Sequence, residues 1–109
     1  MSTYLFTFNL YLYDLSTGDE KLAGTFEKYC NTITQARAEA IWILRSPRIS
    51  ACPWYVDVFK REPGQINRNY IGQVSTKVNV KSTSMPSTFY WTTFYGKKTK
   101  ILRNGTLAD

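Results

Sequence analysis

The sequence predicts an α+β fold, a two-layer sandwich in which a single helix covers one face of an antiparallel sheet. One segment, residues 32–46, carries apolar residues at the three- and four-residue spacing of an amphipathic helix. The segments on either side of it alternate apolar and polar residues, as the strands of a half-exposed sheet do. The predicted order is β-β-α-β-β followed by a C-terminal β-hairpin, in one domain spanning residues 1–109. With a single covering helix, the opposite face of the sheet is left to water or to a partner.

Two strands are expected ahead of the helix, and they are most simply a hairpin. Residues 4–15 alternate, turn-forming residues follow at 14–20, and a second strand is predicted over 22–30. The buried face is expected to carry Tyr4, Phe6, Phe8, Leu10, Leu12, Leu22, Phe26 and Cys30. The opposite face is expected to carry Asn9, Tyr11, Tyr13 and Tyr29.

The helix has recognisable start and stop signals. Thr32, with Gln35 three residues later, has the form of a capping box, and Thr34 is a competing N-cap. Pro47 ends the element, because the residue before a proline is driven out of the α region. The buried stripe is expected to contain Ile33, Ala36, Ala40 and Ile43, with Leu44 beside it. The outer side is expected to carry Arg37, Ile41 and Arg45, with Trp42 one step round the helix.

Four strands are expected after the helix. They span residues 54–61, 69–80, 89–95 and 99–103, while residues 47–53 and 81–87 are predicted as loops. The residues expected to point inward in the first two of these strands are Trp54, Val56, Val58, Tyr70, Val74, Val78 and Val80. Gly72 indicates a bulge or a close approach of the helix, and Asn104-Gly105 favours a type I′ turn.

The residue types that most catalysis needs are missing. The chain has no histidine, which removes the commonest general base and most zinc sites. The acidic residues are scattered, and neither a P-loop nor a G-x-G-x-x-G segment is present. Cys30 and Cys52 would lack a histidine to activate either thiol. We therefore predict a protein that is not an enzyme, with no catalytic residues, no cofactor and no metal.

The N-terminus and the lengths of the apolar runs bear on location. Residues 1–4 lack a basic region ahead of an apolar run, so no secretory signal is predicted. No apolar run reaches the roughly 20 residues that a membrane span needs. The expected setting is intracellular and cytoplasmic, in the host cell if the protein is viral, with both cysteines as free thiols.

The positive charge is concentrated towards the C-terminus. The net charge is +6, and residues 63–109 supply all of it, with seven basic residues against Asp109. Four of these basic residues, Lys97, Lys98, Lys100 and Arg103, follow closely on the aromatic residues Tyr90, Trp91, Phe94 and Tyr95. Cations that hold phosphates and rings that stack on bases are what proteins use to bind single-stranded nucleic acid. The alternative is that lysines at an exposed hairpin serve solubility and protect an edge strand.

Two further surfaces are candidates for binding. Tyr11 and Tyr13, with Asn9 on the same face of the strand, would form a stacking platform on the exposed sheet face, or would pack against a partner subunit. A second candidate interface lies on the outer side of the helix, where Trp42 is flanked by Arg37 and Arg45. Tryptophan and arginine are favoured anchors of protein interfaces, although a tryptophan at the edge of the core with solvated arginines would give the same pattern.

These features predict a small non-enzymatic binding protein that holds nucleic acid, single-stranded rather than double-stranded, through the basic C-terminal hairpin. The alternative is a protein-binding inhibitor or adaptor of the kind encoded by viruses and mobile elements, anti-CRISPR proteins among them. Such a protein would act on an acidic partner or one that handles nucleic acid. A homodimer that completes the sheet is compatible with either function. No motif in the sequence indicates a family.

Overall fold

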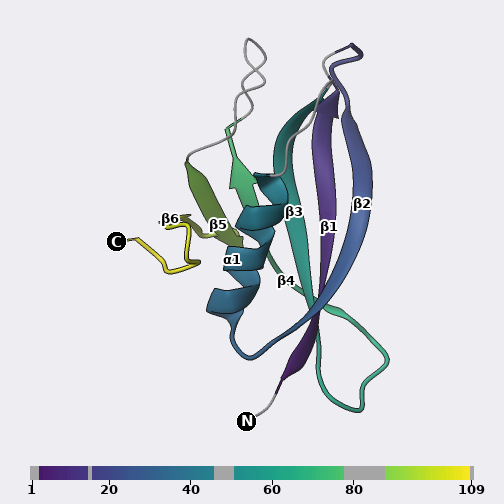
Figure 1. The fold of residues 1–109 in the computed structure, drawn as a ribbon, viewed down its shortest axis with the longest axis vertical. Helices are drawn as coiled ribbons and strands as arrows, with labels where there is room; N and C mark the ends of the chain where they lie inside the picture. The colour runs from purple at the N-terminus through teal and green to yellow at the C-terminus, as the bar shows by residue number, and fades with distance from the viewer. Residues whose placement is uncertain (1–2, 15, 46–50, 78–87, 109) are drawn as a thin grey trace.

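The computed structural model describes residues 3–14, 16–45, 51–77 and 88–108, and consists of one helix and a six-stranded antiparallel sheet (Figure 1). The elements are β1 (Tyr4–Asp14), β2 (Glu20–Cys30), α1 (Ile33–Leu44), β3 (Ala51–Arg61), β4 (Asn69–Thr76), β5 (Phe89–Thr93) and β6 (Lys98–Ile101). The spatial order of the strands is β2-β1-β3-β4-β5-β6, and each neighbouring pair is antiparallel. The predicted α+β fold, with one helix against one face of an antiparallel sheet, is confirmed.

Some boundaries differ from the predicted ones. β3 begins at Ala51, so residues 51–53, predicted as part of a loop, belong to the strand. Pro53 is tolerated there because it lies beside a shift in the register between β1 and β3. At the other end of the chain, no described residue other than glycine has a positive φ, so Asn104-Gly105 does not form a type I′ turn. The predicted strand end at 78–80 and the loop at 81–87 lie outside the described residues.

The strand register divides the sheet into two faces. Residues directly opposite each other on neighbouring strands share a face, and successive residues of one strand alternate between faces. The face under α1, called the covered face below, buries Phe6, Phe8, Leu10 and Leu12 of β1 and Val56, Val58, Val74, Phe89, Trp91 and Ile101 of the other strands. The opposite face, called the open face, carries the side chains between these positions. The alternation predicted for β1 is therefore confirmed.

The helix begins with the predicted cap. The Thr32 side chain accepts a hydrogen bond from the backbone N–H of Gln35 at 3.1 Å, and the Gln35 side chain accepts one from Asn31 N–H at 2.7 Å. These contacts satisfy backbone donors that have no partner inside the helix. The fully buried Ala36 and Ala40 confirm the predicted close packing on the sheet.

The buried side of α1 is wider than the sequence predicted. Ile41 is 2% exposed and lies in the core, not on the outer side, whereas Ile33 is 39% exposed. The chain after β6 packs against α1, where Gly105 meets Thr34 and Arg37. A Cβ added to Gly105 would lie 2.1 Å from the Thr34 carbonyl oxygen, so only glycine fits at this contact, where its φ is +88°. The C-terminal segment therefore covers a flank of the helix that sequence periodicity assigned to solvent.

Gly72 marks both a bulge and a close approach. The register between β3 and β4 shifts beside it, between Val58 and Phe59. A Cβ at Gly72 would lie 2.5 Å from the ring of Trp91 on β5. The bulge was predicted, but the group that approaches Gly72 is this indole ring and not the helix. The shift also moves Tyr70 to the open face, although it was predicted to point inward.

Candidate functional site: the open face of the sheet

The open face is organised as three rows of side chains that run across the strands. Each row is named here for its residue on β3. The Tyr55 row contains Tyr11, Tyr55, Ser75, Tyr90 and Lys100. The Asp57 row contains Asn9, Asp57, Gln73, Thr92 and Lys98. The Phe59 row contains Thr7, Phe59 and Tyr70, with Phe94 next to Tyr70. Two aromatic rows thus flank a polar one, and lysines end two of the three rows at β6.

The Tyr55 row joins the tyrosines that the sequence singled out to two rings from β3. Tyr11 stacks on Tyr55 with the ring centroids 4.8 Å apart, and Tyr13 meets Trp54 edge to face at 5.7 Å. Burial raises the pKa of Tyr55 above its usual range, and a hydrogen bond with Glu20 adds to the rise. The rings of Tyr11 and Tyr13 are half-buried in these contacts, so part of the predicted platform is already occupied by neighbouring rings.

The Phe59 row ends in two aromatic residues that the turn between β5 and β6 presents to solvent. Phe59 contacts Tyr70, and Tyr70 contacts Phe94 at a centroid distance of 6.3 Å. Phe94 is 66% exposed and Tyr95 is 92% exposed. The centroids of their rings are 5.5 Å apart. Turns usually take polar residues or glycine at such positions, since nothing there rewards apolar surface. Two adjacent rings displayed in this way are therefore a candidate contact for a ligand.

The backbone fixes the position of these rings. Gly96 N–H donates to Thr93 C=O at 2.8 Å, and Thr93 N–H donates to Lys97 C=O at 2.9 Å. The Thr93 hydroxyl also accepts a hydrogen bond from Lys97 N–H at 3.1 Å. Gly96 supplies the left-handed conformation that closes the turn, with φ at +89°. These hydrogen bonds hold the turn in which Phe94 and Tyr95 are exposed.

Three exposed lysines lie on the same hairpin as the displayed rings. Lys97, Lys98 and Lys100 are exposed, and Lys98 Nζ lies 4.6 Å above the ring of Tyr90. The pairing of Lys100 with Tyr90 places Lys98 and Lys100 on the open face with the aromatic residues. Three of the four basic residues named from the sequence thus lie on the same hairpin as Tyr95.

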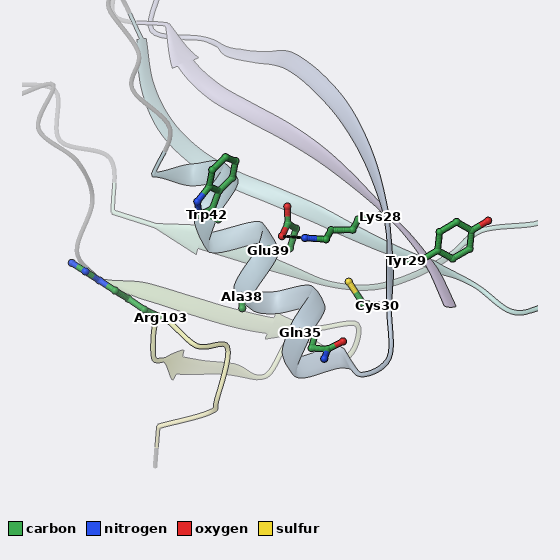
Figure 2. A pocket seen from close by; sticks show the side chains of 8 residues that line it. All are labelled: Lys28, Tyr29, Cys30, Gln35, Ala38, Glu39, Trp42 and Arg103. Atoms are coloured by element: carbon green, nitrogen blue, oxygen red, sulfur yellow. Dashed lines mark hydrogen bonds and ion pairs between the residues drawn. The ribbon is translucent and has the colours of Figure 1, made fainter. Parts of the chain in front are cut away.

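Arg103 and Trp91 do not belong to this group. Arg103 follows β6 and lies beside α1, on the covered side of the sheet (Figure 2). Trp91 is only 5% exposed, faces Val74 across the strands and packs in the core, so its ring cannot stack on a base. The prediction for Trp91 is wrong because alternation along β5 puts Trp91 and Tyr90 on opposite faces.

The second candidate interface, on the helix, is also revised. Arg37 is buried, and its Nε donates to the Gly105 carbonyl oxygen at 2.7 Å. Its guanidinium lies 5.3 Å from the centroid of the Trp91 ring, and burial lowers its pKa. Arg37 thus ties the C-terminal segment to the helix and is not available as a surface anchor. Arg45 is half-buried, and Trp42 is 67% exposed.

A shallow groove of about 730 Å³ adjoins Trp42, between α1 and β2 (Figure 2). It is lined by Lys28, Tyr29, Cys30, Gln35, Ala38, Glu39, Trp42 and Arg103. An ion pair of 2.9 Å between Lys28 Nζ and Glu39 Oε2 crosses it, and Tyr29 points away from the helix. Cys30 is buried, and burial raises the pKa of its thiol, which disfavours a reactive thiolate. The predicted free thiol of Cys52 lies outside the described side chains.

The described part of the chain contains no cluster of metal ligands and no membrane-spanning helix. In residues 3–14, 16–45, 51–77 and 88–108, no three His, Cys, Asp or Glu side chains gather as metal ligands would. Within the same ranges, α1 is too short to cross a membrane. The sequence matches no protein-family model, and no curated protein and no solved structure resembles it significantly.

The Asp57 row supplies the acidic group nearest the centre of the open face. Gln73 Nε2 donates to Asp57 Oδ1 at 3.2 Å, and Thr25 Oγ1 donates to Asn9 Oδ1 at 3.0 Å. Burial raises the pKa of the Asp57 carboxyl above its ordinary value, and the charge of Glu20 adds to this. The ionised carboxylate is therefore less favourable here than in the unfolded chain.

We expect Asp57→Asn to raise the melting temperature at neutral pH. Because the native pKa is raised, the folded chain holds this proton more tightly than the unfolded chain. The stability from this group is present below the ordinary pKa of 3.8 and is lost as the pH rises to the native pKa. The amide removes the charge and keeps an oxygen acceptor for Gln73. Thermal unfolding followed by circular dichroism should show the gain at neutral pH and its disappearance in acid. A lower melting temperature at neutral pH would contradict this.

Proposed function

We propose that this protein is a non-enzymatic binder of single-stranded nucleic acid and that the β5–β6 hairpin is its contact surface. The observation that carries the proposal is the display of Phe94 and Tyr95 in a turn beside three exposed lysines. Rings stack on bases of any sequence, and lysines neutralise the phosphates between them. In a duplex the faces of the bases are already stacked on one another, so exposed rings favour a single strand.

The charge on the open face supports binding near β6 and not near β2. Lys98 and Lys100 end their rows at the β6 edge. Glu20 and Glu27 lie on the open face at the β2 edge, opposite Tyr13 and Thr7 of β1, and Asp57 lies between the two edges. A polyanion is attracted to the first edge and repelled from the second. The proposed path therefore runs along the hairpin and past Tyr90, and does not cross β1 and β2.

Replacing Tyr95 by alanine tests the stacking part of the proposal. If the ring stacks on a base, affinity for single-stranded nucleic acid should fall by roughly 1–3 kcal/mol. The dependence of affinity on salt should stay nearly unchanged, because the lysines that neutralise the phosphates are all still present. The fold should be unaffected, since Tyr95 is 92% exposed. Fluorescence anisotropy at two salt concentrations measures both quantities.

A matched control is Ile66→Ala, which removes an apolar side chain that is 90% exposed in the connection between β3 and β4. This variant should bind as the parent does. If the parent and Tyr95→Ala bind single-stranded nucleic acid with equal affinity, the Tyr95 ring does not stack on a base. If the parent has no affinity at all, the inhibitor or adaptor that binds a protein becomes the better proposal.

A further inference from the structure

The two edge strands of the sheet differ in whether another part of the chain covers their backbone groups. β6, at one edge, is four residues long and is followed by a segment that folds back on it. Leu102 N–H donates to Thr106 C=O at 2.9 Å, Ala108 N–H donates to Lys100 C=O at 2.8 Å, and Ile101 forms a bridge with Leu107. These contacts use backbone groups that an edge strand otherwise leaves open to other chains.

β2, at the other edge, has no such cover among the described residues. It is eleven residues long and pairs with β1 on one side, and Figure 1 shows it at the border of the sheet. Three of its large apolar side chains are exposed: Leu22 (51%), Phe26 (43%) and Tyr29 (66%). A long edge strand with exposed apolar residues is a template for pairing with another strand.

We propose that β2 pairs antiparallel with β2 of a second copy of this chain, about a two-fold axis that passes beside Phe26. Such an axis is perpendicular to the sheet, so each face continues into the same face of the second copy. In this register Phe26 lies opposite Phe26 of the second copy. Thr25 lies opposite the second copy's Glu27, and Gly24 opposite its Lys28.

The bulge in β2 brings a further pair of apolar side chains opposite each other in the proposed dimer. Gly24 pairs with Leu10 and Leu22 pairs with Tyr11, so Ala23 is the extra residue. Beyond the bulge, Leu22 therefore lies opposite Tyr29 of the second copy and on the same face. The three large exposed side chains of β2 thus meet apolar side chains across the axis.

Neighbouring registers bring like charges together. An axis at Thr25 places Lys21 opposite Lys28, an axis at Gly24 places Glu20 opposite Glu27, and an axis at Glu27 places that residue opposite itself. Like charges directly opposite on paired strands are destabilising. Charge and apolar contact therefore select the Phe26 register and a second copy as the occupant of this edge. The pairing does not depend on nucleic-acid binding.

The test is the oligomeric state of the full chain by sedimentation equilibrium over a range of concentrations. The parent should form a dimer. Phe26→Lys and Phe26→Glu should each raise the dimer dissociation constant at least about tenfold, because each puts two like charges at the axis and removes the ring pair. An equimolar mixture of the two variants should recover dimer, since the ammonium and the carboxylate then face each other. Ile66→Lys, the same kind of change away from β2, should leave the parent dimer intact.

Circular dichroism checks that each variant is folded. If the Phe26 variants are not, Leu22→Asp serves instead, since it removes both pairings of Leu22 with Tyr29 and should also weaken the dimer. A parent that stays monomeric at every concentration would overturn the proposal. A dimer that survives the changes at Phe26 and Leu22 would do the same, because its interface would lie elsewhere.

Discussion

We expect affinity for single-stranded nucleic acid to fall at least about tenfold when glutamine replaces Lys97, Lys98, Lys100 and Arg103 together. The salt dependence should also flatten, by about 0.7 of a logarithmic unit of slope for each phosphate that the variant no longer neutralises. The fold should persist, because exposed charges of turns and short strands contribute little to stability. Anisotropy titrations at about 50 and 200 mM salt give the slope.

The four residues do not lie together in the structure, so their expected contributions to affinity differ. Three lysines lie at the hairpin with Tyr95, whereas Arg103 lies beside α1. The triple lysine variant should therefore show nearly the whole effect, and Arg103→Gln alone should show little. A control of equal charge replaces three exposed basic residues elsewhere, Lys21, Arg68 and Lys77, by glutamine. If the affinity of this control falls as far as that of the lysine variant, binding depends on net charge and not on the hairpin.

The second large effect is on stability, where Ala40→Arg should severely destabilise or unfold the protein. Ala40 is fully buried between α1 and the sheet. An arginine there overpacks the helix–sheet interface and buries a charge without a partner, which costs more than about 4 kcal/mol. Whole domains are stable by only about 5–15 kcal/mol, so this cost is a large fraction of the free energy of unfolding.

Urea unfolding followed by circular dichroism measures this destabilisation. Ala38→Arg is the matched control, since Ala38 is half-buried at the groove in Figure 2, where a long side chain can reach solvent. It should keep most of the stability of the parent. An Ala40→Arg protein with an unchanged unfolding midpoint would mean that α1 does not pack on the sheet through this residue.

The fold class was predictable because its signals are local. Strict alternation in β1 placed Tyr11 and Tyr13 on the face opposite Phe6 and Phe8, as the structure has them. The Thr32 cap set the start of the only predicted helix. From these elements the order β-β-α-β-β and a two-layer arrangement follow by packing alone.

The site was less predictable, for two physical reasons. Bulges change which face a side chain occupies, and one beside Gly72 moved Tyr70 to the open face. Interactions between residues distant in sequence change which side chains are buried, as the hydrogen bond from Arg37 to Gly105 shows. Trp91 is different, because alternation already indicates that Tyr90 and Trp91 lie on opposite faces of the sheet, so that only one of them can share a face with the lysines. Trp91 was predicted to bind nucleic acid because it lies near the lysines in the sequence, and this criterion was wrong.

The most direct measurement is the binding of the unmodified chain to fluorescently labelled nucleic acid. Single- and double-stranded DNA and RNA should be titrated separately at low and at moderate salt. Binding through the hairpin predicts saturable anisotropy changes at low salt, tighter for single strands than for duplexes, with affinity that falls as salt rises. A signal that stays flat with all four nucleic acids at low salt would contradict nucleic-acid binding by this protein.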